Sequence, residues 1–423
     1  MRVLVIGSGG REHALTWAIS RDPLVSAVLA TPGNPGIARI AQLIPLPSGV
    51  DALADLAARE GIDLTVVGPE LPLSEGITDA FQRRRLAIVG PTRAAAALES
   101  SKAFAKAFMD RHRVPTARYR LAVTEDEALG LIRSGELGLP LVVKADGLAA
   151  GKGVVVASDR ATAEEAVTGM MRERRFGDAG ARVVLEECLS GPELSFFVLS
   201  DGERAVPIGS AQDHKRAFDA DTGPNTGGMG AFSPSPLCDG ALQDRVLREV
   251  VRPVIDGMRA EGHPYTGFLY CGLMLTPTGP RVIEFNVRFG DPEAQVVLPL
   301  ISGGLAEALR AAALGDVQKV SLRFTRECAV GVVLASGGYP DAYQTGKPIL
   351  GVDDAAAVPG VVVFHAGTAH RDGRLVTAGG RVITVVARAL GFEEARARAY
   401  EAAALISFEG MHMRRDIGLK ALR

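Results

Sequence analysis

Three polar side chains alternate along the segment Val282 to Gln295, which reads VIEFNVRFGDPEAQ. They are the carboxylate of Glu284, the carboxamide of Asn286 and the guanidinium of Arg288. Residues two apart on a strand share a face, so a strand would direct all three groups to one side. A hard cation such as Mg²⁺ takes one or two protein oxygens beside substrate phosphates, and an arginine can steady a phosphoryl group. The segment therefore predicts a phosphoryl-transfer face on which Glu284 and Asn286 bind the metal.

An ordinary half-buried strand whose polar face meets water would show the same alternation. The residues that follow favour the functional interpretation, because Phe289 to Glu293 reads FGDPE and predicts a turn with two further carboxylates. This context shifts the balance from a surface strand towards a catalytic site.

A second candidate phosphate site is the segment Val142 to Ser158, VVKADGLAAGKGVVVAS. Two β-branched runs flank a loop, which predicts a β-hairpin with a glycine-rich tip. Glycines let backbone N–H groups approach phosphate oxygens, and lysines add positive charge. The spacing differs from that of the Walker loop, and a strand follows instead of a helix. The residues concerned are Gly147, Gly151, Gly153, Lys144 and Lys152.

Lysine is rare in this chain, with eight lysines among 47 basic residues and none before Lys102. Any lysine could be a solvated surface charge, but the glycine loop favours phosphate contact for Lys144. Five of the eight fall in the stretch that we assign to nucleotide and substrate: Lys102, Lys106, Lys144, Lys152 and Lys215.

The segment Arg182 to Gly202 lies between these two signals in the sequence. An apolar strand ends in Glu186 and Glu187, a Gly-Pro turn follows, and Glu193 opens a second strand. A strand end that exposes backbone N–H and C=O groups could bind adenine, while a nearby carboxylate takes the ribose hydroxyls. An edge hairpin with exposed acids is the alternative.

The ordered set of these motifs resembles the ATP-grasp carboxylate-amine ligases, and more narrowly the glycinamide ribonucleotide synthetase family, also called phosphoribosylamine-glycine ligases. The resemblance runs from VLVIGSGGREHAL to TAGGRV and covers essentially the whole chain. It implies that ATP, glycine and 5-phosphoribosylamine give glycinamide ribonucleotide, ADP and phosphate, an early step of purine synthesis. The segments that carry it are Val3 to Leu15, Asp213 to Arg216, Asp221 to Pro234, Arg288 to Glu293, Ser336 to Pro340 and Thr377 to Val382.

The resemblance also implies roles for individual residues. Arg288 and Lys144 are the expected catalytic groups, and Mg²⁺ or Mn²⁺ is expected on Glu284 and Asn286, with ATP as co-substrate. Asp213 or Asp291 could hold the glycine ammonium group. The expected ATP-binding residues are Lys102, Lys144, Gly151, Lys152, Gly153, Glu186, Glu187, Leu189 and Glu193. The expected substrate-binding residues are Gly9, Gly10, Arg11, Glu12, Gly33, Asn34, Asp213, Lys215, Arg288, Gly290 and Asp291.

Two departures from the family pattern stand out. ATP-grasp enzymes commonly carry another acidic metal ligand on the preceding strand, but Phe268 to Leu275 contains no acid. The family often has Tyr-Arg before Asp-Ile-Gly near the C-terminus, whereas this chain has Met413 and Arg414, so no role is carried to that tail. A different ATP-grasp ligase of purine metabolism is the alternative function, and the loop Asp213 to Pro234 argues against it.

Composition excludes several other classes of protein. A formal net charge of −2 gives no global attraction to nucleic acid or membrane. The four cysteines lack Cys-x-x-Cys spacing, so neither a zinc site nor a disulfide framework is indicated. We expect small-molecule substrates, no nucleic-acid or membrane partner, a cytoplasmic location and a monomer.

The first hundred residues alternate short apolar strands with helices, which predicts an open parallel sheet with its ligand at the strand C-termini. Gly7 to Gly10 suggests a dinucleotide loop, but Glu12 stands where the third glycine of that motif would fall, so NAD binding is disfavoured. Backbone N–H groups at a helix start still suit a single phosphate. The expected elements are strands at 3–6, 25–30, 64–67 and 86–89, and a helix at 12–20.

The fold class expected is α/β, in three domains. They are an N-terminal parallel α/β domain at 1–101, an ATP-grasp domain at 102–325 with a lid at about 115–200, and a small C-terminal α/β domain at 326–423. A helix from about Lys102 to Arg113 opens the second domain, and Asp213 to Pro236 is expected to be a long loop. The third domain is expected to contain strands at 329–335, 361–365 and 382–387 and a helix at 393–406, to pack on the first, and to contribute no chemistry of its own.

Overall fold

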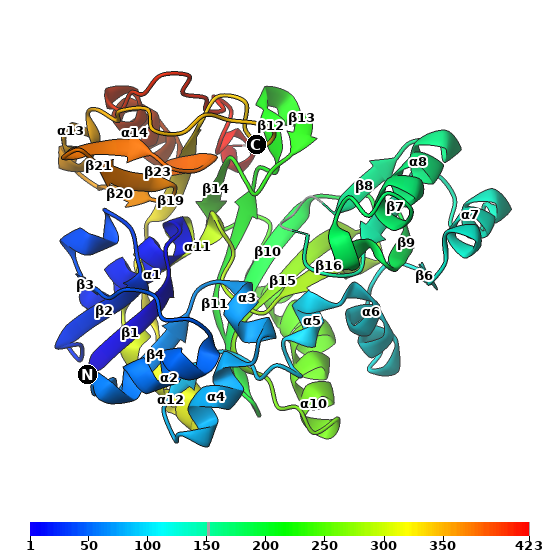
Figure 1. Cartoon of the computed structure of the whole chain (residues 1–423), viewed down its shortest axis with the longest axis horizontal. Helices are drawn as coiled ribbons and strands as arrows, with labels where there is room; N and C mark the ends of the chain where they lie inside the picture. Colours follow the sequence, from blue (N-terminus) through cyan, green and yellow to red (C-terminus); the bar gives the residue numbers. More distant parts are fainter. Residues whose placement is uncertain (150–152, 423) are drawn as a thin grey trace.

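The N-terminal part of the chain forms a five-stranded parallel sheet in the order β3-β2-β1-β4-β5 (Figure 1). The structure is a computed structural model that describes residues 1–149 and 153–422. Its strands are short, apolar and buried, as their sequences predict. The strands are β1 (Arg2–Gly7), β2 (Ala27–Pro32), β3 (Gln42–Leu43), β4 (Leu64–Val67) and β5 (Ile88–Val89), and the helices include α1 (Gly10–Ser20), α2 (Val50–Arg59), α3 (Glu70–Ser74), α4 (Ile77–Arg83) and α5 (Ala97–Ser100).

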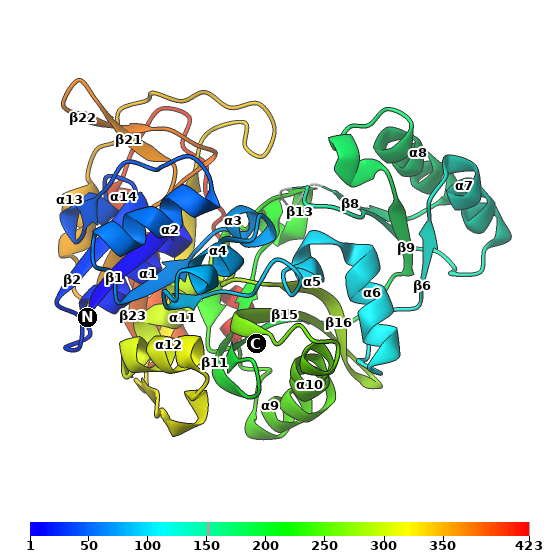
Figure 2. The same ribbon diagram turned by 60° about the horizontal axis from the view of Figure 1, so that its bottom comes forward.

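A small lobe projects from the rest of the molecule and contains a four-stranded antiparallel sheet in the order β6-β9-β7-β8 (Figures 1 and 2). The lobe has a hydrophobic core of its own, in which Val143 and Leu185 of the sheet meet Ala163 and Val167 of a helix. It follows helix α6 (Lys102–Arg111) and is the predicted lid. Its elements are β6 (Tyr119–Ala122), α7 (Glu125–Ser134), β7 (Leu141–Ala145), β8 (Val154–Ala157), α8 (Arg160–Met171) and β9 (Val183–Glu187).

An eight-stranded antiparallel sheet in the order β16-β15-β10-β11-β14-β19-β23-β20 forms the body. The expected boundary near residue 325 falls between β14 (Gly230–Ser233) and β19 (Cys328–Ala335), which pair directly within this sheet. The central and C-terminal parts of the chain are therefore joined by backbone hydrogen bonds. The other strands are β10 (Glu193–Asp201), β11 (Ala205–Asp213), β15 (Thr266–Thr276), β16 (Gly279–Asn286), β20 (Val361–His365) and β23 (Arg381–Ala389).

Helices cover both faces of this sheet. Helices α9 (Gly240–Val246) and α10 (Arg252–Ala260) pack Val246 and Ile255 on one face, and helices α11 (Glu293–Val297) and α12 (Leu305–Leu314) pack on the other. Helix α14 (Phe392–Leu405) lies on β19 and β23 with a stripe of buried alanines. Within the part of the chain described, no helix has the length and apolar character needed to cross a bilayer.

The expected extent of the lid is wrong at its C-terminal end. The expected range ran to residue 200, but β10 pairs with β11 and β15 in the body, so the lid sheet ends at Glu187. The strand, turn and strand at 182–201 resemble a hairpin in sequence. The turn at Gly191, where φ is +150°, instead passes the chain from one sheet to the other.

The expectation of a long loop from Asp213 to Pro236 is also wrong. The segment contains a small hairpin, β12 (Arg216–Phe218) and β13 (Thr222–Asn225), and then β14 of the body sheet. Its strands are too short and too rich in glycine for a period of two to be visible in the sequence. The buried side chain of Arg414 supports this hairpin. It pairs with Asp221 beside the hairpin turn at 2.9 Å and with Asp416 of the C-terminal tail at 2.7 Å.

The C-terminal domain packs on the N-terminal domain, as expected. The His365 N–H donates to Nδ1 of His13 at 2.8 Å, and Nδ2 of Asn34 donates to the His365 carbonyl at 2.9 Å. Burial, together with the charge that His365 would carry, lowers the pKa of His13 to about 3, so the ring stays neutral at ordinary pH. The interface between the two domains is thus set by directed hydrogen bonds.

Candidate active site

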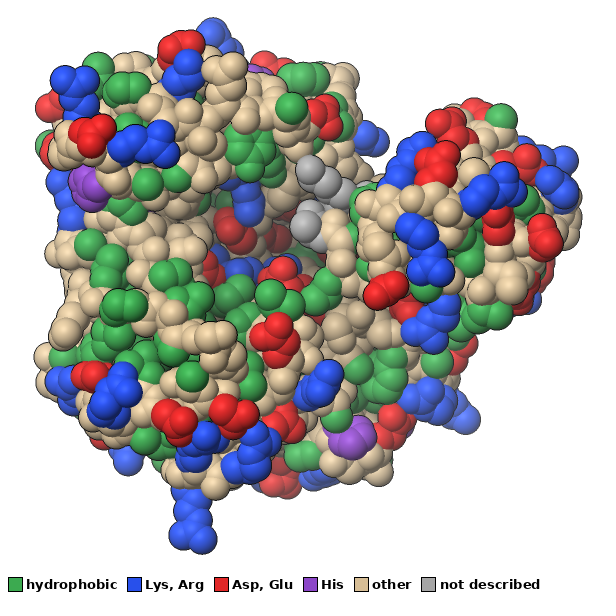
Figure 3. All heavy atoms as spheres, in the orientation of Figure 1, with side chains coloured by type: hydrophobic (Ala, Val, Ile, Leu, Met, Phe, Trp, Pro, Cys, Tyr) green, Lys and Arg blue, Asp and Glu red, His purple; other side chains and the backbone are tan. Residues whose placement is uncertain are grey.

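The predicted site residues that the structure describes belong to the N-terminal domain, the lid and the body sheet with the turn that follows it. The space-filling view shows a hollow at the centre of the molecule, with acidic and basic side chains gathered inside it (Figure 3). Strand β16 ends at Asn286, within the predicted phosphoryl-transfer segment. Gly151 and Lys152, which we predicted to contact phosphate, lie outside the described residues.

Strand β16 and the residues after it place Glu284, Asn286 and Arg288 on one side, as predicted. A bulge in the pairing of β15 with β16 falls between Val282 and Glu284, and beyond it the alternation is regular. Phe285 and Val287 point into the core, while the three polar side chains stay partly exposed. The face that the sequence predicts therefore exists.

A buried carboxylate lies behind this face. Glu99, on α5, accepts the N–H of Val287 at 2.7 Å and pairs with Nη2 of Arg288 at 3.0 Å. With the Asn286 carboxamide turned to satisfy its neighbours, its nitrogen also donates to Glu99 at 3.1 Å. Burial raises the pKa of Glu99, although Arg288 opposes this. One side chain of the N-terminal part thus orients both polar residues at the end of β16.

Arg288 is held on two sides. Its Nε atom lies 3.2 Å from Glu70 at the start of α3, in addition to the contact with Glu99. Burial alone would lower the pKa of Arg288, but these two carboxylates raise it above its ordinary value. The guanidinium is therefore a fixed positive charge at the edge of the cleft.

Glu284 lies in the field of several cations. Burial alone would raise its pKa, but Lys215, Lys144 and Lys102 lower it below the usual range. The carboxylate is therefore ionised at neutral pH, as a metal ligand must be. These interactions place the three lysines near the Glu284 carboxylate.

Lys102 contacts the loop of the lid hairpin. Its Nζ atom donates to the Gly147 carbonyl at 3.2 Å, and its own N–H donates to the Asp146 carbonyl at 3.0 Å. The Asp146 carboxylate caps the start of α6 by accepting the Ala103 N–H at 2.7 Å, and it pairs with Arg182. The predicted lysine and the predicted loop therefore meet at one place.

Lys144 and Glu186 form an ion pair at 2.9 Å, inside the joint between the lid and the body. Lys144 also donates to the Ile283 carbonyl of β16 at 3.1 Å. The neighbouring Glu187 turns the other way and pairs with Arg118 at 2.7 Å. Leu189 is partly exposed in the connection that follows, and Glu193 at the start of β10 pairs with Lys215 at 2.8 Å.

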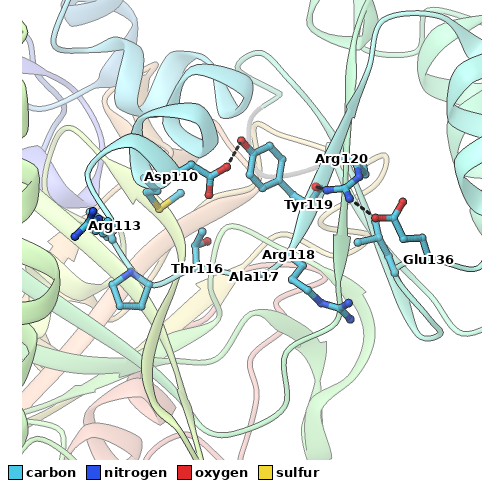
Figure 4. Close-up of a pocket in the computed structure, with 12 residues that line it drawn as sticks. Asp110, Arg113, Thr116, Ala117, Arg118, Tyr119, Arg120 and Glu136 are labelled. Carbon is cyan, nitrogen blue, oxygen red and sulfur yellow. Dashed lines mark hydrogen bonds and ion pairs between the residues drawn. The ribbon is translucent and has the colours of Figure 1, made fainter.

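A separate hollow of about 510 Å³ lies beside the linker from α6 to β6 (Figure 4). None of the predicted site residues is among those that line it. Several of its polar groups contact one another: Tyr119 donates to Asp110 at 2.9 Å, and Arg120 pairs with Glu136. This hollow therefore lies apart from the predicted site residues, beside the linker that joins α6 to the lid.

A second group of carboxylates faces Glu284 from β11 and α11. Burial raises the pKa of Asp213 to about 7 against the opposing charge of Lys215. Burial also raises the pKa of Glu293, which accepts a hydrogen bond from the Ser195 hydroxyl at 3.1 Å. An added Cβ at Gly290 would lie 2.5 Å from Glu293, so this glycine lets the turn close over the carboxylate.

The C-terminal domain contributes a residue to the cleft, contrary to expectation. Nη2 of Arg381, on β23, pairs with Asp291 at 3.1 Å, and Nη1 donates to the Asp291 carbonyl at 2.8 Å. Burial would raise the pKa of Asp291, but Arg381 and Arg11 keep it low. Arg381 begins an apolar strand with no motif around it, so its contact with Asp291 could not be predicted from the sequence.

The glycine-rich loops of the N-terminal domain border the same turn. The Gly9 N–H donates to Glu12 at 2.6 Å, and Arg11 pairs with the other oxygen of Glu12 at 2.6 Å and also donates to the Phe289 carbonyl at 3.3 Å. An added Cβ at Gly10 would lie 2.5 Å from Gln295 of α11. Gly33, at φ +69°, follows β2, and its neighbour Asn34 bonds the Ser8 carbonyl at 2.8 Å. The loops of β1 and β2 therefore open into the central cleft.

The donor set fits a divalent cation that shares its coordination with phosphates. Among residues 1–149 and 153–422, no group of three or more histidine, cysteine or acidic side chains could hold a metal by itself. Glu284 and Asn286 nevertheless provide an ionised carboxylate and a carboxamide on one face, which is the small oxygen set that Mg²⁺ uses beside a nucleotide. The arrangement can neutralise a polyphosphate and bring an acid and an amine to its end.

The three domain models of the phosphoribosylglycinamide synthetase family match this chain in order. The N-domain model matches residues 1–99, the ATP-grasp (A) domain model matches residues 100–294 and the C-domain model matches residues 329–420.

Whole-chain relatives and a solved structure agree with this order. The chain is 49% identical over 426 residues to a phosphoribosylamine–glycine ligase of Vibrio vulnificus, with 100% of this chain and 99% of the relative covered. The ligase of the same name from Pseudomonas aeruginosa is 49% identical over 425 residues, with 100% and 98% covered. The crystal structure of phosphoribosylamine–glycine ligase from Thermotoga maritima superposes with a TM-score of 0.83 at 35% identity, covering 98% of this chain and 100% of the other.

Proposed function

The chain belongs to the phosphoribosylglycinamide synthetase family, and from this premise we propose how its cleft performs the ATP-dependent ligation of glycine to 5-phosphoribosylamine. The enzyme is an ADP-forming ligase of purine biosynthesis, and its products are glycinamide ribonucleotide, ADP and phosphate. The observation that carries the residue assignments is the polar face at the end of β16, which Lys102, Lys144 and Lys215 surround.

The reaction proceeds through glycyl phosphate, because a free carboxylate is a poor electrophile. One carboxylate oxygen of glycine attacks the γ-phosphorus of ATP, and ADP leaves with the electron pair of the broken bond. The amine of phosphoribosylamine then attacks the carbonyl carbon, phosphate leaves, and the nitrogen loses a proton. The protein positions the reactants and neutralises the charge of the phosphates, as in other phosphoryl transfers.

Lysines and the lid bind the nucleotide. Lys102 and Lys144 contact the phosphates, and Arg288 stabilises the charge of the transferring phosphoryl group. Glu284 and Asn286 would hold one or two Mg²⁺ or Mn²⁺ ions, which would neutralise charge on the phosphate oxygens. The other residues assigned to ATP are Gly151, Lys152, Gly153, Glu186, Glu187, Leu189 and Glu193.

The two acceptor substrates meet at the turn after β16. Phosphoribosylamine lies on the N-terminal loops, where backbone N–H groups suit its phosphate. Glycine lies between Asp213 and Asp291, either of which can hold its ammonium group, with Lys215, Arg288 and Gly290 beside them. The loop residues assigned to phosphoribosylamine are Gly9, Gly10, Arg11, Glu12, Gly33 and Asn34.

We retain three domains at 1–101, 102–325 and 326–423 as part of the proposal. The change from a parallel sheet to helix α6 supports the first boundary. The boundary near residue 325 divides the sequence, but the two regions on either side of it share one sheet and do not form separate bodies.

Isotopic labelling tests the proposed route directly. We expect the enzyme, given ATP, carboxyl-¹⁸O glycine and freshly generated phosphoribosylamine, to transfer label to inorganic phosphate as ADP is released. Omission of glycine should abolish ADP release and serves as the control. Product formed together with unlabelled phosphate would exclude the acyl phosphate.

The pH dependence of glycine binding should report on Asp213. Its pKa is raised to about 7, so the carboxylate that binds an ammonium group forms as the pH rises through that value. We therefore expect the KM for glycine to fall between about pH 6 and about pH 8, where glycine itself keeps its charge. The Asp213→Asn variant should lose this step, and Asp244→Asn, at an exposed site on α9, should keep it. A glycine KM that falls equally in Asp213→Asn would assign the ammonium group to another residue.

A further inference from the structure

Lys106 is a buried lysine to which the proposed chemistry gives no role. It lies on α6, one turn beyond Lys102, and only 2% of its surface is exposed. Its Nζ atom lies 3.0 Å from Oε2 of Glu186 and donates to the Thr116 hydroxyl at 2.7 Å. A buried ammonium group is costly unless it is paired and hydrogen-bonded, so a lysine in this position needs an explanation.

Glu186 is shared between two lysines. It is 3% exposed, and its other oxygen, Oε1, lies 2.9 Å from Nζ of Lys144. Among the described residues Oε1 receives no hydrogen bond, so the contact with Lys144 is an ion pair without hydrogen-bond geometry. Lys144 directs its hydrogen bond to the Ile283 carbonyl instead. Lys106 likewise directs a hydrogen bond to another acceptor, the Thr116 hydroxyl. Of the two lysines, Lys144 is the one that helps to lower the pKa of Glu284, so it is the one placed to turn towards phosphates beside that carboxylate.

Withdrawal of Lys144 creates an electrostatic problem. If Lys144 turns to the phosphates of ATP, Glu186 loses one of its two counter-charges while it stays buried. An uncompensated buried carboxylate is strongly unfavourable, so without a second cation Glu186 would compete with ATP for Lys144. Lys106 supplies that second cation, and its ammonium group is held in place by Glu186 and by the Thr116 hydroxyl.

The same residues tie the lid to the body. Thr116, in the linker, donates its hydroxyl to the Val282 carbonyl at 2.7 Å, and Lys144 of β7 bonds the adjacent Ile283 carbonyl. Both carbonyls belong to β16, two residues or fewer before Glu284. Lys106 thus connects α6 and β9 at the point where the lid meets the strand that carries the metal face.

We propose that Lys106 is a positioning residue that keeps Glu186 neutralised, so that Lys144 is free to leave Glu186 and bind the phosphates of ATP. The inference rests on the proposed role of Lys144 in phosphate binding. Lys106 itself touches no substrate. Lys106 affects the affinity for nucleotide, because its charge neutralises the Glu186 carboxylate when the charge of Lys144 is directed to ATP.

The first test measures the affinity for a non-hydrolysable ATP analogue by calorimetry. Lys106→Met should raise the Kd by about tenfold or more, since Glu186 then keeps Lys144. The KM for glycine should not change, and Lys106→Arg, which keeps the charge, should bind more tightly than Lys106→Met. Arg111→Met, which removes an exposed charge from the same helix, is the matched control and should bind as the wild type does.

A double-mutant cycle separates this role from simple packing. In a Glu186→Gln background no carboxylate needs neutralising, so adding Lys106→Met should leave the Kd for the analogue unchanged. A further tenfold loss in that background would overturn the proposal, as would wild-type affinity in Lys106→Met alone. If Lys106→Met alone does not fold, the comparison of Glu186→Gln with the double variant still tests the proposal.

Lys144→Met separates failure of the inference from failure of the proposed function. If Lys144→Met binds the analogue as the wild type does, the assignment of Lys144 to phosphate is wrong and the inference falls with it. If Lys144→Met weakens binding but Lys106→Met does not, only the role of Lys106 is wrong.

Proton uptake gives a readout that packing alone would not move. Burial lowers the pKa of Lys106 to about 8, against the attraction of Glu186 from β9. The other groups that face it are Lys144 from β7, Asp110 on its own helix, and the ring of Tyr119 from β6, at 5.8 Å.

When Lys144 leaves, Glu186 depends on Lys106 alone, so the pKa of Lys106 should rise and binding should take up a proton near pH 8. Analogue affinity in the wild type should therefore fall as the pH rises through about 8. Calorimetry in buffers of different ionisation enthalpy should show less proton uptake by Lys106→Met than by the wild type. Equal uptake by both proteins would contradict the proposal.

Discussion

Glu284→Gln should lower the turnover number by about a hundredfold or more while changing the affinity for ATP little. The carboxylate is ionised because Lys215, Lys144 and Lys102 hold its pKa down. Glutamine keeps the shape of the side chain but removes the charge that a divalent cation requires. The charge that this cation neutralises grows as the phosphoryl group transfers, so the loss should fall mainly on the chemical step.

The measurement is a comparison of kcat at saturating Mg²⁺ with the Kd for a non-hydrolysable ATP analogue. Glu307→Gln, at an exposed position on α12, controls for the substitution itself. If Glu284→Gln turns over at the wild-type rate, Glu284 is not a ligand of the metal. A loss confined to analogue affinity would mean that the metal serves only to hold the nucleotide.

Arg288→Lys should reduce turnover by about a thousandfold, the range seen when an arginine that stabilises a transferring phosphoryl group is lost. The guanidinium is held at 3.2 Å by Glu70 and at 3.0 Å by Glu99, and its Nη1 atom donates to the Phe289 carbonyl at 3.2 Å, so its orientation is fixed. A lysine keeps the charge but cannot bind two carboxylates and a phosphoryl group in one plane. Binding of the analogue should be much less affected.

A second substitution at the same position separates charge from geometry. Arg288→Met should lose as much activity and also unfold more readily in urea, by about 3 kcal/mol, because Glu99 is left buried without its cation. Arg310→Lys, at an exposed position on α12, is the control for the lysine variant. If Arg288→Lys keeps most of the wild-type turnover, the phosphoryl group must be stabilised by another residue.

The grouping of polar side chains in the cleft could be predicted from the sequence wherever those side chains share one element. Glu284, Asn286 and Arg288 follow the period of a strand, and Lys144 belongs to the hairpin that carries the glycine loop. The short apolar strands of the N-terminal domain could also be predicted from local sequence, because a buried parallel strand is almost continuously hydrophobic. In each case the signal is local, and the structure confirms the element.

Residues that act from a distance could not be predicted in this way. Glu99 reaches Arg288 across 189 positions of the chain and stands at the end of a short helix, where acids are ordinary. Arg381 arrives from the C-terminal domain, and Glu293 follows the predicted turn but becomes significant only through its burial. The hairpin after Asp213 was missed because Arg414, far along the chain, supports it. Tertiary contacts determine these features, and one sequence does not display them.

The strand pairing between β14 and β19 has a consequence for how the substrates influence one another. Movement of the C-terminal domain relative to the body would break backbone hydrogen bonds within a single sheet, whereas the lid has its own core and is joined to the body by a linker. On the proposed assignment, the part of the acceptor pocket where Arg381 contacts Asp291 is therefore assembled without nucleotide. Occupancy of that pocket by the amine should then alter the equilibrium affinity for ATP only slightly, because no conformational equilibrium of the body is shared between the two ligands.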